Sequence, residues 1–281
     1  MTPTNLRAIW MKPRKLVAPS SQAIKLDAIR ANAGIEAKYR KALQALIEEM
    51  SRSVIYWTRA AWKKSPPLMA TDGIHMPFVD LRRTMERLGR HWQRRFDETA
   101  DQLADVFVNG ATQHTDAAMM AALKRAGFTI KFQMTQAAKE SYQAVLQENI
   151  ALIKSIPAEY LHDVQTAVWQ SVKSGHDLGT LTDALRSKYA VSFKRAALIS
   201  RDQNNKAKAV IENVRRQELG ITTAIWQHSG GGKEPRPSHV EASGKSFELA
   251  KGMYLDGEWL LPGQAINCRC TSRAVIPGFE D

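Results

Sequence analysis

The chain's only two cysteines, Cys268 and Cys270, stand one residue apart near its C-terminus, and two histidines, His228 and His239, precede them in the same segment. Thiolate and imidazole groups are ligands that zinc prefers, and a structural zinc site takes four ligands. One interpretation is a zinc site of His239, Cys268 and Cys270, with His228 or water as the fourth ligand. Zinc knuckles generally use Cys-x-x-Cys. The favoured interpretation is therefore two small buried side chains, with no cofactor expected.

The same residues admit a hydrolytic interpretation. His239, Glu241 and Asn267 could hold a divalent metal and cut phosphodiesters. The segment lacks a cluster of carboxylates for magnesium, and the chain has no phosphate-binding G-x-x-x-x-G-K-[ST] loop, no G-x-S-x-G elbow and no H-E-x-x-H motif. We therefore predict that the protein is not an enzyme. The alternative is a metal-dependent nuclease or toxin-like effector that uses the His239, Cys268 and Cys270 cluster.

Long amphipathic helices should position this segment. Apolar residues recur every three or four positions from Tyr39 to Ala61 through Trp57, and again from Phe78 to Phe96, so each run predicts one buried helix face. The stretch KKSPPLMATDG between them predicts a loop. Pro157 is expected in a first helical turn, with Asp177 or Thr180 capping a later helix. Further helices are predicted across 97 to 124, 133 to 155, 158 to 174, 178 to 189 and 193 to 218, with ends at Gly127, Gly175 and Gly220.

Four arginines lie opposite the second apolar stripe. Guanidinium groups pair with phosphates, so this row is a candidate nucleic-acid contact. The favoured alternative is a solvated outer face, because residues 67 to 100 carry a net charge of only +1. The four arginines are Arg83, Arg87, Arg90 and Arg94.

The character of the sequence changes after Gly220. The stretch ITTAIWQHS alternates apolar and polar residues as a strand does, and GMYLDGEWLLP predicts a hairpin around Asp256 and Gly257. The predicted fold is mainly α, with a long helical N-terminal body and a small α+β C-terminal module. The predicted domains are a helical, basic region at 1–155 and a module at 156–281, which is helical to about residue 219.

The positive charge gathers at one end. The net charge is +12, of which residues 1 to 66 supply +9, from 13 Lys and Arg against 4 Asp and Glu. Such a field attracts polyanions such as DNA, RNA or an acidic protein surface, although basic residues also serve solubility alone. The chain shows no apolar run of the length that a signal peptide or a membrane span needs, so no membrane partner is expected. With two cysteines that cannot bond to each other without strain, we expect a reducing compartment.

The segment from Ile156 to Cys270 resembles the phage head morphogenesis family of Mu F-like proteins. The likeness is carried by IPAEYLHDVQTAVWQSVKSGHDLGTLTDALRSKY, by RAALISRDQNNKAKAVIENVRRQELGI, and by the closing pattern PGQAINCRC. The loop GGGKEPRPSH departs from the family pattern in its longer glycine run. The matching residues are Arg195, Arg201, Asp202, Gln203, Asn204, Trp226, Arg236, Pro237, Ser238, His239, Gly244, Pro262, Gly263, Asn267, Cys268, Arg269 and Cys270.

The resemblance implies a minor capsid protein. It would be made in the host cytoplasm and join the prohead near the portal vertex, with the portal protein and capsid or scaffold proteins as partners, and double-stranded DNA as a further one. A plain bacterial DNA-binding protein is a third interpretation, for which no helix-turn-helix pattern is found. Arg201, Arg236 and Arg269 are the expected contact residues of the module, and their alternative role is internal, fixing Asn267 and the hairpin to the helix.

Overall fold

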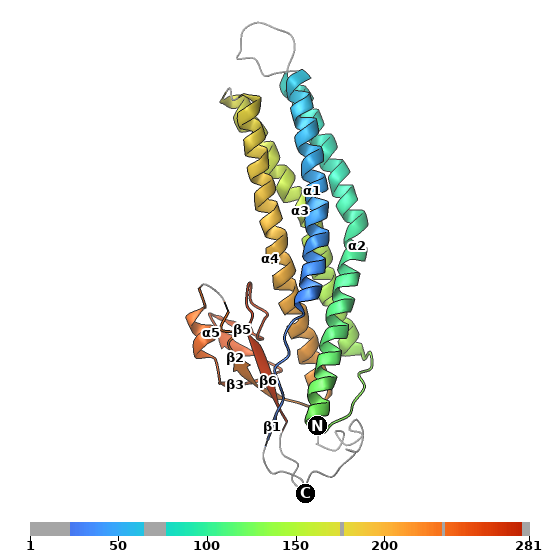
Figure 1. Ribbon diagram of the computed structural model, residues 1–281, viewed down its shortest axis with the longest axis vertical. Coiled ribbons are helices and arrows are strands. Elements are labelled where there is room, and N and C mark those ends of the chain that lie inside the picture. The colour runs from blue at the N-terminus through green and yellow to red at the C-terminus, as the bar shows by residue number, and fades with distance from the viewer. Residues whose placement is uncertain (1–22, 65–76, 175–176, 232–233, 277–281) are drawn as a thin grey trace. The chain divides into compact units, whose positions relative to one another are not determined.

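The computed structural model describes residues 23–64, 77–174, 177–231 and 234–276, which form four long helices and a small sheet module (Figure 1). The predicted class, mainly α with a small α+β C-terminal module, is confirmed. Within these ranges, no helix is both long and apolar enough to cross a membrane. In chain order the elements are β1 (Ile24–Lys25), α1 (Ala33–Lys64), α2 (Pro77–Arg125), α3 (Gln136–Lys173), α4 (Leu178–Glu218), β2 (Thr223–Gln227), α5 (Pro237–Glu241), β3 (Ser246–Glu248), β4 (Met253–Leu255), β5 (Glu258–Leu260) and β6 (Thr271–Ile276).

The predicted apolar stripes of α1 and α2 are largely buried. Near the end of α1 the prediction is wrong: Trp57, predicted to be buried, is 45% exposed, and Trp62 is buried instead. The side chains that are buried as predicted are Tyr39, Leu43, Leu46, Met50 and Val54 in α1, and Leu81, Met85, Leu88, Trp92 and Phe96 in α2. Most of the predicted loop KKSPPLMATDG lies outside the described residues, and its first two lysines end α1.

Three predicted helix boundaries are wrong because the helices continue through them. α2 runs without a break past residue 97 to Arg125, and α4 continues through residues 190 to 192. Pro157 lies inside α3 instead of in the first turn of a new helix. Ile153, Ile156 and Tyr160 around it are buried, so packing offsets the one backbone hydrogen bond that proline cannot donate.

The predicted helix ends at Gly127, Gly220 and Asp177 agree with the structure. Gly127 and Gly220 have φ of +93° and +71°, the left-handed conformation that closes a helix. The backbone N–H of Ile221 donates to the carbonyl of Arg216 at 2.9 Å, which satisfies one of the last carbonyls of α4. At the start of α4, the carboxylate of Asp177 accepts from the backbone N–H of Thr180 at 2.9 Å. Gly175 lies outside the described residues.

The chain forms two compact units, each built from separated segments. The first, called here the sheet unit, comprises 1–36, 106–146 and 201–281, and the second, the helical unit, comprises 37–105 and 147–200. Each of the four long helices contributes residues to both units. The predicted division at residue 155 is a different one, because it places 1–36 and 201–281 in separate domains. The module at 156–281 stays a prediction.

The sheet unit contains a four-stranded antiparallel sheet in the order β1-β6-β2-β3. Burial alternates along β2 and β6, as expected for strands with one face on the core. The predicted hairpin is confirmed as β4 and β5, with Asp256 and Gly257 at positive φ between them. Strand β1 is a feature that the sequence did not predict: Ile24 and Lys25, from the N-terminal region, pair with Ile276 and Val275 of β6.

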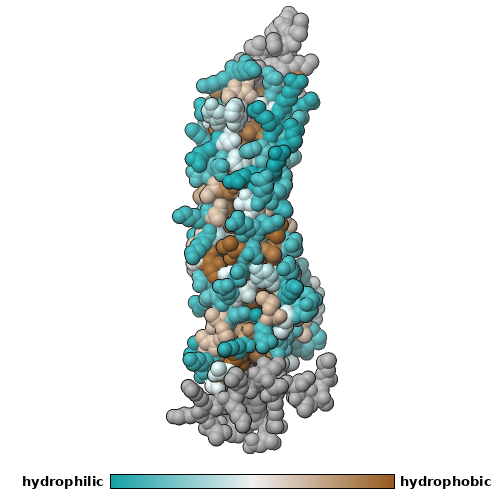
Figure 2. Space-filling model, turned by 90° about the vertical axis from the view of Figure 1, so that its right-hand side faces the viewer, coloured by the Kyte–Doolittle hydropathy of each residue, from teal (hydrophilic) through white to brown (hydrophobic). Residues whose placement is uncertain are grey.

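The core of the sheet unit joins the sheet to α2 and to the segment that follows α4. Trp226, Ala224 and Phe247 from the sheet lie in one cluster with Met119 and Leu123 of α2. On the face that Figure 2 shows, the helices carry mainly hydrophilic residues, with hydrophobic residues in separate patches. This pattern is that of amphipathic helices whose apolar sides pack inward.

Candidate functional site

The loop before β6 carries the two cysteines and rests against α4. At Gly263, with φ of +96°, a Cβ atom would lie 3.3 Å from the backbone oxygens of Asn205 and Cys270. Glycine therefore allows the loop to approach the helix backbone closely. This contact explains the glycine of the PGQAINCRC stretch.

Asn267 sets the backbone at the start of the cysteine pair. Its φ of +58° is left-handed, a conformation that asparagine tolerates better than most residues. Two side chains of α4 hold it: the carboxylate of Asp202 accepts from the Asn267 backbone N–H at 2.9 Å, and the guanidinium of Arg201 donates to its side-chain oxygen at 3.4 Å. The family-pattern residues of α4 thus position the loop that carries the cysteines.

Cys268, Cys270 and His239 converge in the interior of the sheet unit. All three are buried, and His239 reaches them from α5. The Nδ1 atom of His239 lies 3.4 Å from Sγ of Cys268 and 3.7 Å from Sγ of Cys270. Arg269, between the cysteines, is exposed. The backbone therefore places alternate residues on opposite sides, as an extended strand does, so that both sulfurs face inward.

The two thiols are coupled electrostatically. A hydrogen bond from Cys270 lowers the pKa of Cys268, and the same interaction, together with burial, raises the pKa of Cys270. Backbone groups and the nearby His239 also favour the charged form of Cys268. The interaction therefore favours a charged thiol at Cys268 and disfavours one at Cys270.

His239 is oriented by an aromatic ring and faces a carboxylate. The indole of Trp226 meets the imidazole edge to face, with ring centroids 5.3 Å apart. On the other side, Nε2 of His239 lies 3.9 Å from a carboxylate oxygen of Asp256, which accepts from the Ser238 hydroxyl at 2.9 Å. Among the described residues, this buried Nε2 has no hydrogen-bond partner.

His228 is not part of the convergent group. Among the described histidines, cysteines and acidic residues, the set whose ligand atoms gather here is His239, Cys268 and Cys270 alone. The Nδ1 atom of His228 accepts from the backbone N–H of Gly230 at 3.2 Å, because the chain turns back on itself after β2. Of the two predicted fourth ligands, His228 or water, the described geometry therefore favours water, and His228 lines the neighbouring pockets instead.

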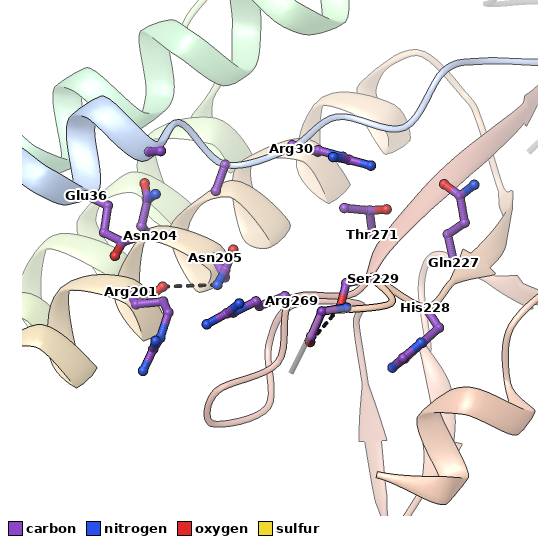
Figure 3. Close-up of a pocket in the computed structure, with 13 residues that line it drawn as sticks. Arg30, Glu36, Arg201, Asn204, Asn205, Gln227, His228, Ser229, Arg269 and Thr271 are labelled. Atoms are coloured by element: carbon purple, nitrogen blue, oxygen red, sulfur yellow. Dashed lines mark hydrogen bonds between the residues drawn. The ribbon is translucent and has the colours of Figure 1, made fainter. Parts of the chain in front are cut away.

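A polar pocket of about 470 Å³ opens beside the cluster (Figure 3). Arg201 from α4, Arg269 from the cysteine loop and Arg30 from the segment after β1 line it, with Glu36 as the acidic residue of the lining. A second pocket, of about 370 Å³, shares Arg201 and Arg269 and reaches the cysteines and His239. The two pockets together present a positively charged concave surface next to the cluster.

The three arginines predicted as contact residues have different roles. Arg236 donates to the backbone carbonyl of Ile266 at 3.0 Å, and Arg201 donates to Asn267, so both hold the loop internally. Arg269 is exposed and has no ion-pair partner among the described residues. Arg269 is therefore the predicted arginine that is best placed to meet another molecule.

The remaining family-pattern residues fall on the same framework, with one exception. Arg195 belongs to the helical unit, where its guanidinium pairs with Glu159. In the sheet unit, Gln203 and Asn204 are buried on α4, Trp226 is on β2, and Pro237 and Ser238 begin α5. Gly244 closes the turn after α5, and Pro262 is buried at the start of the cysteine loop.

The other predicted sites do not gather with the cluster. Glu241 is exposed and pairs with Lys245 at 2.8 Å, and it is not among the described residues whose ligand atoms gather with His239. The arginine row of α2 is solvent-exposed as expected for either of its interpretations, and Arg87 stacks over Trp57 at 5.3 Å. The exposed row consists of Arg83, Arg87, Arg90 and Arg94.

Two residues of the site, Arg30 and Asp256, were not predicted from the sequence. Arg30 enters the pocket because β1 carries the N-terminal segment to β6, and nothing in the local pattern of so short a strand reveals this pairing. Asp256 was noted only as a turn residue, but the hairpin brings its carboxylate to His239. A search for acidic residues near the His and Cys positions could have found Asp256, whereas Arg30 required the fold.

Two comparisons with known proteins found similar sequences. Residues 162–273 match the family described as phage Mu protein F like protein. An uncharacterized protein of Haemophilus influenzae is 27% identical over 271 residues, which cover 95% of this chain and 59% of that protein. The chain thus spans about 59% of the length of the curated relative it matches. No solved structure matches the chain significantly.

The family match contains the whole of α4, α5 and the cysteine loop, and it therefore includes His239, Cys268 and Cys270 but not Arg30. The N-terminal helices α1 and α2 lie outside the matched residues. The resemblance predicted from PGQAINCRC and its partners is therefore confirmed as a likeness: residues 162–273 are similar to the family described as phage Mu protein F like protein.

Proposed function

We propose that the protein is a minor capsid protein that joins the phage prohead near the portal vertex and assists head assembly. The observation that carries the proposal is the family match over 162–273, which includes the candidate site. The proposed location is the virion head, with the host cytoplasm as the place of synthesis and assembly. The portal protein and capsid or scaffold proteins are the proposed partners.

The pocket arginines supply a means of docking. Arg30, Arg201 and Arg269 face a concavity whose lining includes one carboxylate, that of Glu36. Arginine pairs bidentately with carboxylates, so an acidic segment of a head protein is the matching partner. Because a ring of portal subunits repeats its sites, weak docking of each copy is sufficient for stable attachment.

The hairpin offers a second contact surface. Tyr254 on β4 and Trp259 on β5 are 59% and 58% exposed, with ring centroids 5.4 Å apart. Exposed aromatic pairs of this kind are enriched at protein interfaces because they bury a large area at low entropic cost. The hairpin is therefore a second candidate surface for contact with another protein.

The proposal includes no catalytic step. His239 is buried, and Glu241 and Asn267 are occupied by other contacts. These contacts give the nuclease or effector interpretation less support than an assembly role. A direct check is incubation of the chain with plasmid DNA and Mg²⁺ or Zn²⁺: intact plasmid is expected, and metal-dependent nicking that His239→Ala removes would contradict an assembly role alone.

DNA is a proposed additional partner through the basic residues. The exposed arginine row of α2 and the basic residues 1 to 66 would contact phosphates, and such binding weakens steeply as salt rises. A gel-shift series in increasing salt measures this contact for the natural chain and for a variant with Arg7, Lys12, Arg14 and Lys15 replaced by Gln. A salt-sensitive shift that these substitutions weaken is expected, and a shift that they leave unchanged would exclude these four residues as the DNA contact.

Co-purification with head proteins tests the proposed function. The chain is expressed together with the portal and capsid proteins of the same phage, and the affinity of each complex is measured. We expect a complex with the portal protein that Arg269→Glu weakens by about tenfold or more, because the substitution reverses a charge in the docking pocket. The matched control is Arg83→Glu, an exposed arginine of α2 outside the pocket, which should bind like the natural chain. No complex with any head protein would contradict the proposal.

A further inference from the structure

The convergence of His239, Cys268 and Cys270 has the geometry of a metal site. Their ligand atoms all lie within 4.8 Å of one another, and the three side chains are nearly fully buried. Two thiols and an imidazole form a soft donor set that suits zinc and does not suit magnesium or calcium. The three donor groups therefore favour a zinc-like metal ion.

The distances agree with a single tetrahedral ion. Zinc bonds of about 2.3 Å to sulfur and about 2.0 Å to nitrogen, at a tetrahedral angle, separate a bound nitrogen from a bound sulfur by roughly 3.6 Å. The observed separations of His239 Nδ1 from the two sulfurs are 3.4 and 3.7 Å. Only small shifts of the side chains are needed to place one ion against all three atoms.

The surroundings of His239 fit a metal-bound imidazole. If Nδ1 binds the ion, Nε2 carries the proton, and zinc-bound histidines usually donate that proton to a carboxylate or carbonyl. The carboxylate of Asp256 stands 3.9 Å from Nε2 and is held by Ser238. This arrangement also gives a role to a buried nitrogen that has no hydrogen-bond partner among the described residues.

The fourth position faces the pocket. Among the described histidines, cysteines and acidic residues, no other ligand atom joins the group. The pocket of about 370 Å³ that reaches Cys268, Cys270 and His239 is roomy and polar, so a water molecule can supply the fourth ligand. Zinc sites with three protein ligands and a water are well established in proteins.

We propose that the chain binds one zinc ion through His239, Cys268 and Cys270, with water as the fourth ligand. The ion ties α5 to the loop before β6 and fixes the backbone on both sides of Arg269, which projects toward the pocket. This site does not depend on the proposed role in head assembly. It can be tested on the isolated chain.

Metal analysis of the full-length chain, purified without a histidine tag from zinc-supplemented culture, tests the proposal. The expected result is about one zinc ion per chain, and replacement by Co²⁺ should give a thiolate-to-cobalt charge-transfer band. Removal of zinc by a chelator should lower the melting temperature by roughly 5 °C, because the ion links two segments of the folded unit. Re-addition of Zn²⁺ alone should restore it.

Variants separate this site from adventitious binding. The double variant Cys268→Ser with Cys270→Ser should lose the zinc and the cobalt band, and His239→Ala should lose most of the zinc. The matched control is His228→Ala, a histidine of the same pockets outside the ligand set, which should keep both. If the natural chain contains no zinc and shows no charge-transfer band with Co²⁺, the proposal is wrong, whatever the stability of the variants.

Discussion

At the scale of single residues, the site depends on side chains that shape the backbone as much as on those that face the pocket. Asn267 adopts a left-handed conformation immediately before Cys268, and Asp202 and Arg201 of α4 hold it there. The asparagine of the NCRC pattern is therefore explained by backbone geometry. No catalytic role is needed to account for it.

A pair of substitutions at this position should separate backbone strain from lost hydrogen bonding. Asn267→Ala should lower the free energy of unfolding by about 1–2 kcal/mol, because alanine is strained at positive φ. Asn267→Gly should cost clearly less, since glycine accepts this φ and loses only the contact with Arg201. Chemical denaturation of both variants measures the difference. Equal losses for the two variants would show that the conformation of Asn267 does not matter.

The residues of the cluster were predictable to a limited degree. Two cysteines and few histidines in one segment leave few possible partners, so His239 could be paired with Cys268 and Cys270 from the sequence. That His228 lies outside this group could not be predicted from the sequence, because it depends on the turn at Gly230 after β2. Arg269 was predicted among three arginines, and only the contacts of Arg201 and Arg236 distinguish their roles from its own.

At the scale of elements, helix periodicity and the ends at Gly127 and Gly220 were predicted correctly, whereas three boundaries inside the long helices were wrong. The stripes of α1 and α2 were identified, yet α3 was divided at Pro157, which lies inside it. Proline breaks an isolated helix, but here buried neighbours on both sides hold the helix together. Local rules cannot weigh that packing, because it comes from other segments of the chain.

A buried charge network links α4 to the sheet, and it was not predicted from the sequence. Glu212 bonds Lys208 on one side, at 3.1 Å, and Arg216 on the other, and Arg216 donates to the hydroxyl and carbonyl of Ser272 on β6. The spacing of four residues would ordinarily indicate an exposed ion-pair row. Here all of these side chains are almost completely buried, and burial lowers the pKa of the Arg216 guanidinium while Glu212 opposes that shift.

Removal of the shared carboxylate should be costly. Glu212→Ala leaves two buried cations without their counter-ion, so the free energy of unfolding should fall by about 3 kcal/mol or more. Urea denaturation followed by circular dichroism measures this loss. The matched control, Glu241→Ala, removes an exposed partner of Lys245 and should leave the denaturation midpoint unchanged. A midpoint for Glu212→Ala as high as that of the control would contradict a structural role for the network.

At the scale of the whole molecule, the sheet unit draws on both ends of the chain. Strand β1 pairs with β6, and Leu26 and Ile29 beside it are buried in the same core as Trp226. The sequence predicted a separate basic arm for this region because two paired residues leave no periodic signal. The fold class followed from composition and periodicity, whereas the association of distant segments follows only from their packing.

The most direct measurement of the proposed role in head assembly is the protein content of purified phage particles from cells that carry the gene for this chain. Quantitative mass spectrometry of those particles should find the chain in a small number of copies compared with the major capsid protein, as expected for a minor capsid protein. Particles that carry Arg269→Glu should contain less of it, and those that carry Arg83→Glu should contain the usual amount. Complete and infectious particles that lack the chain would contradict a role in building the head.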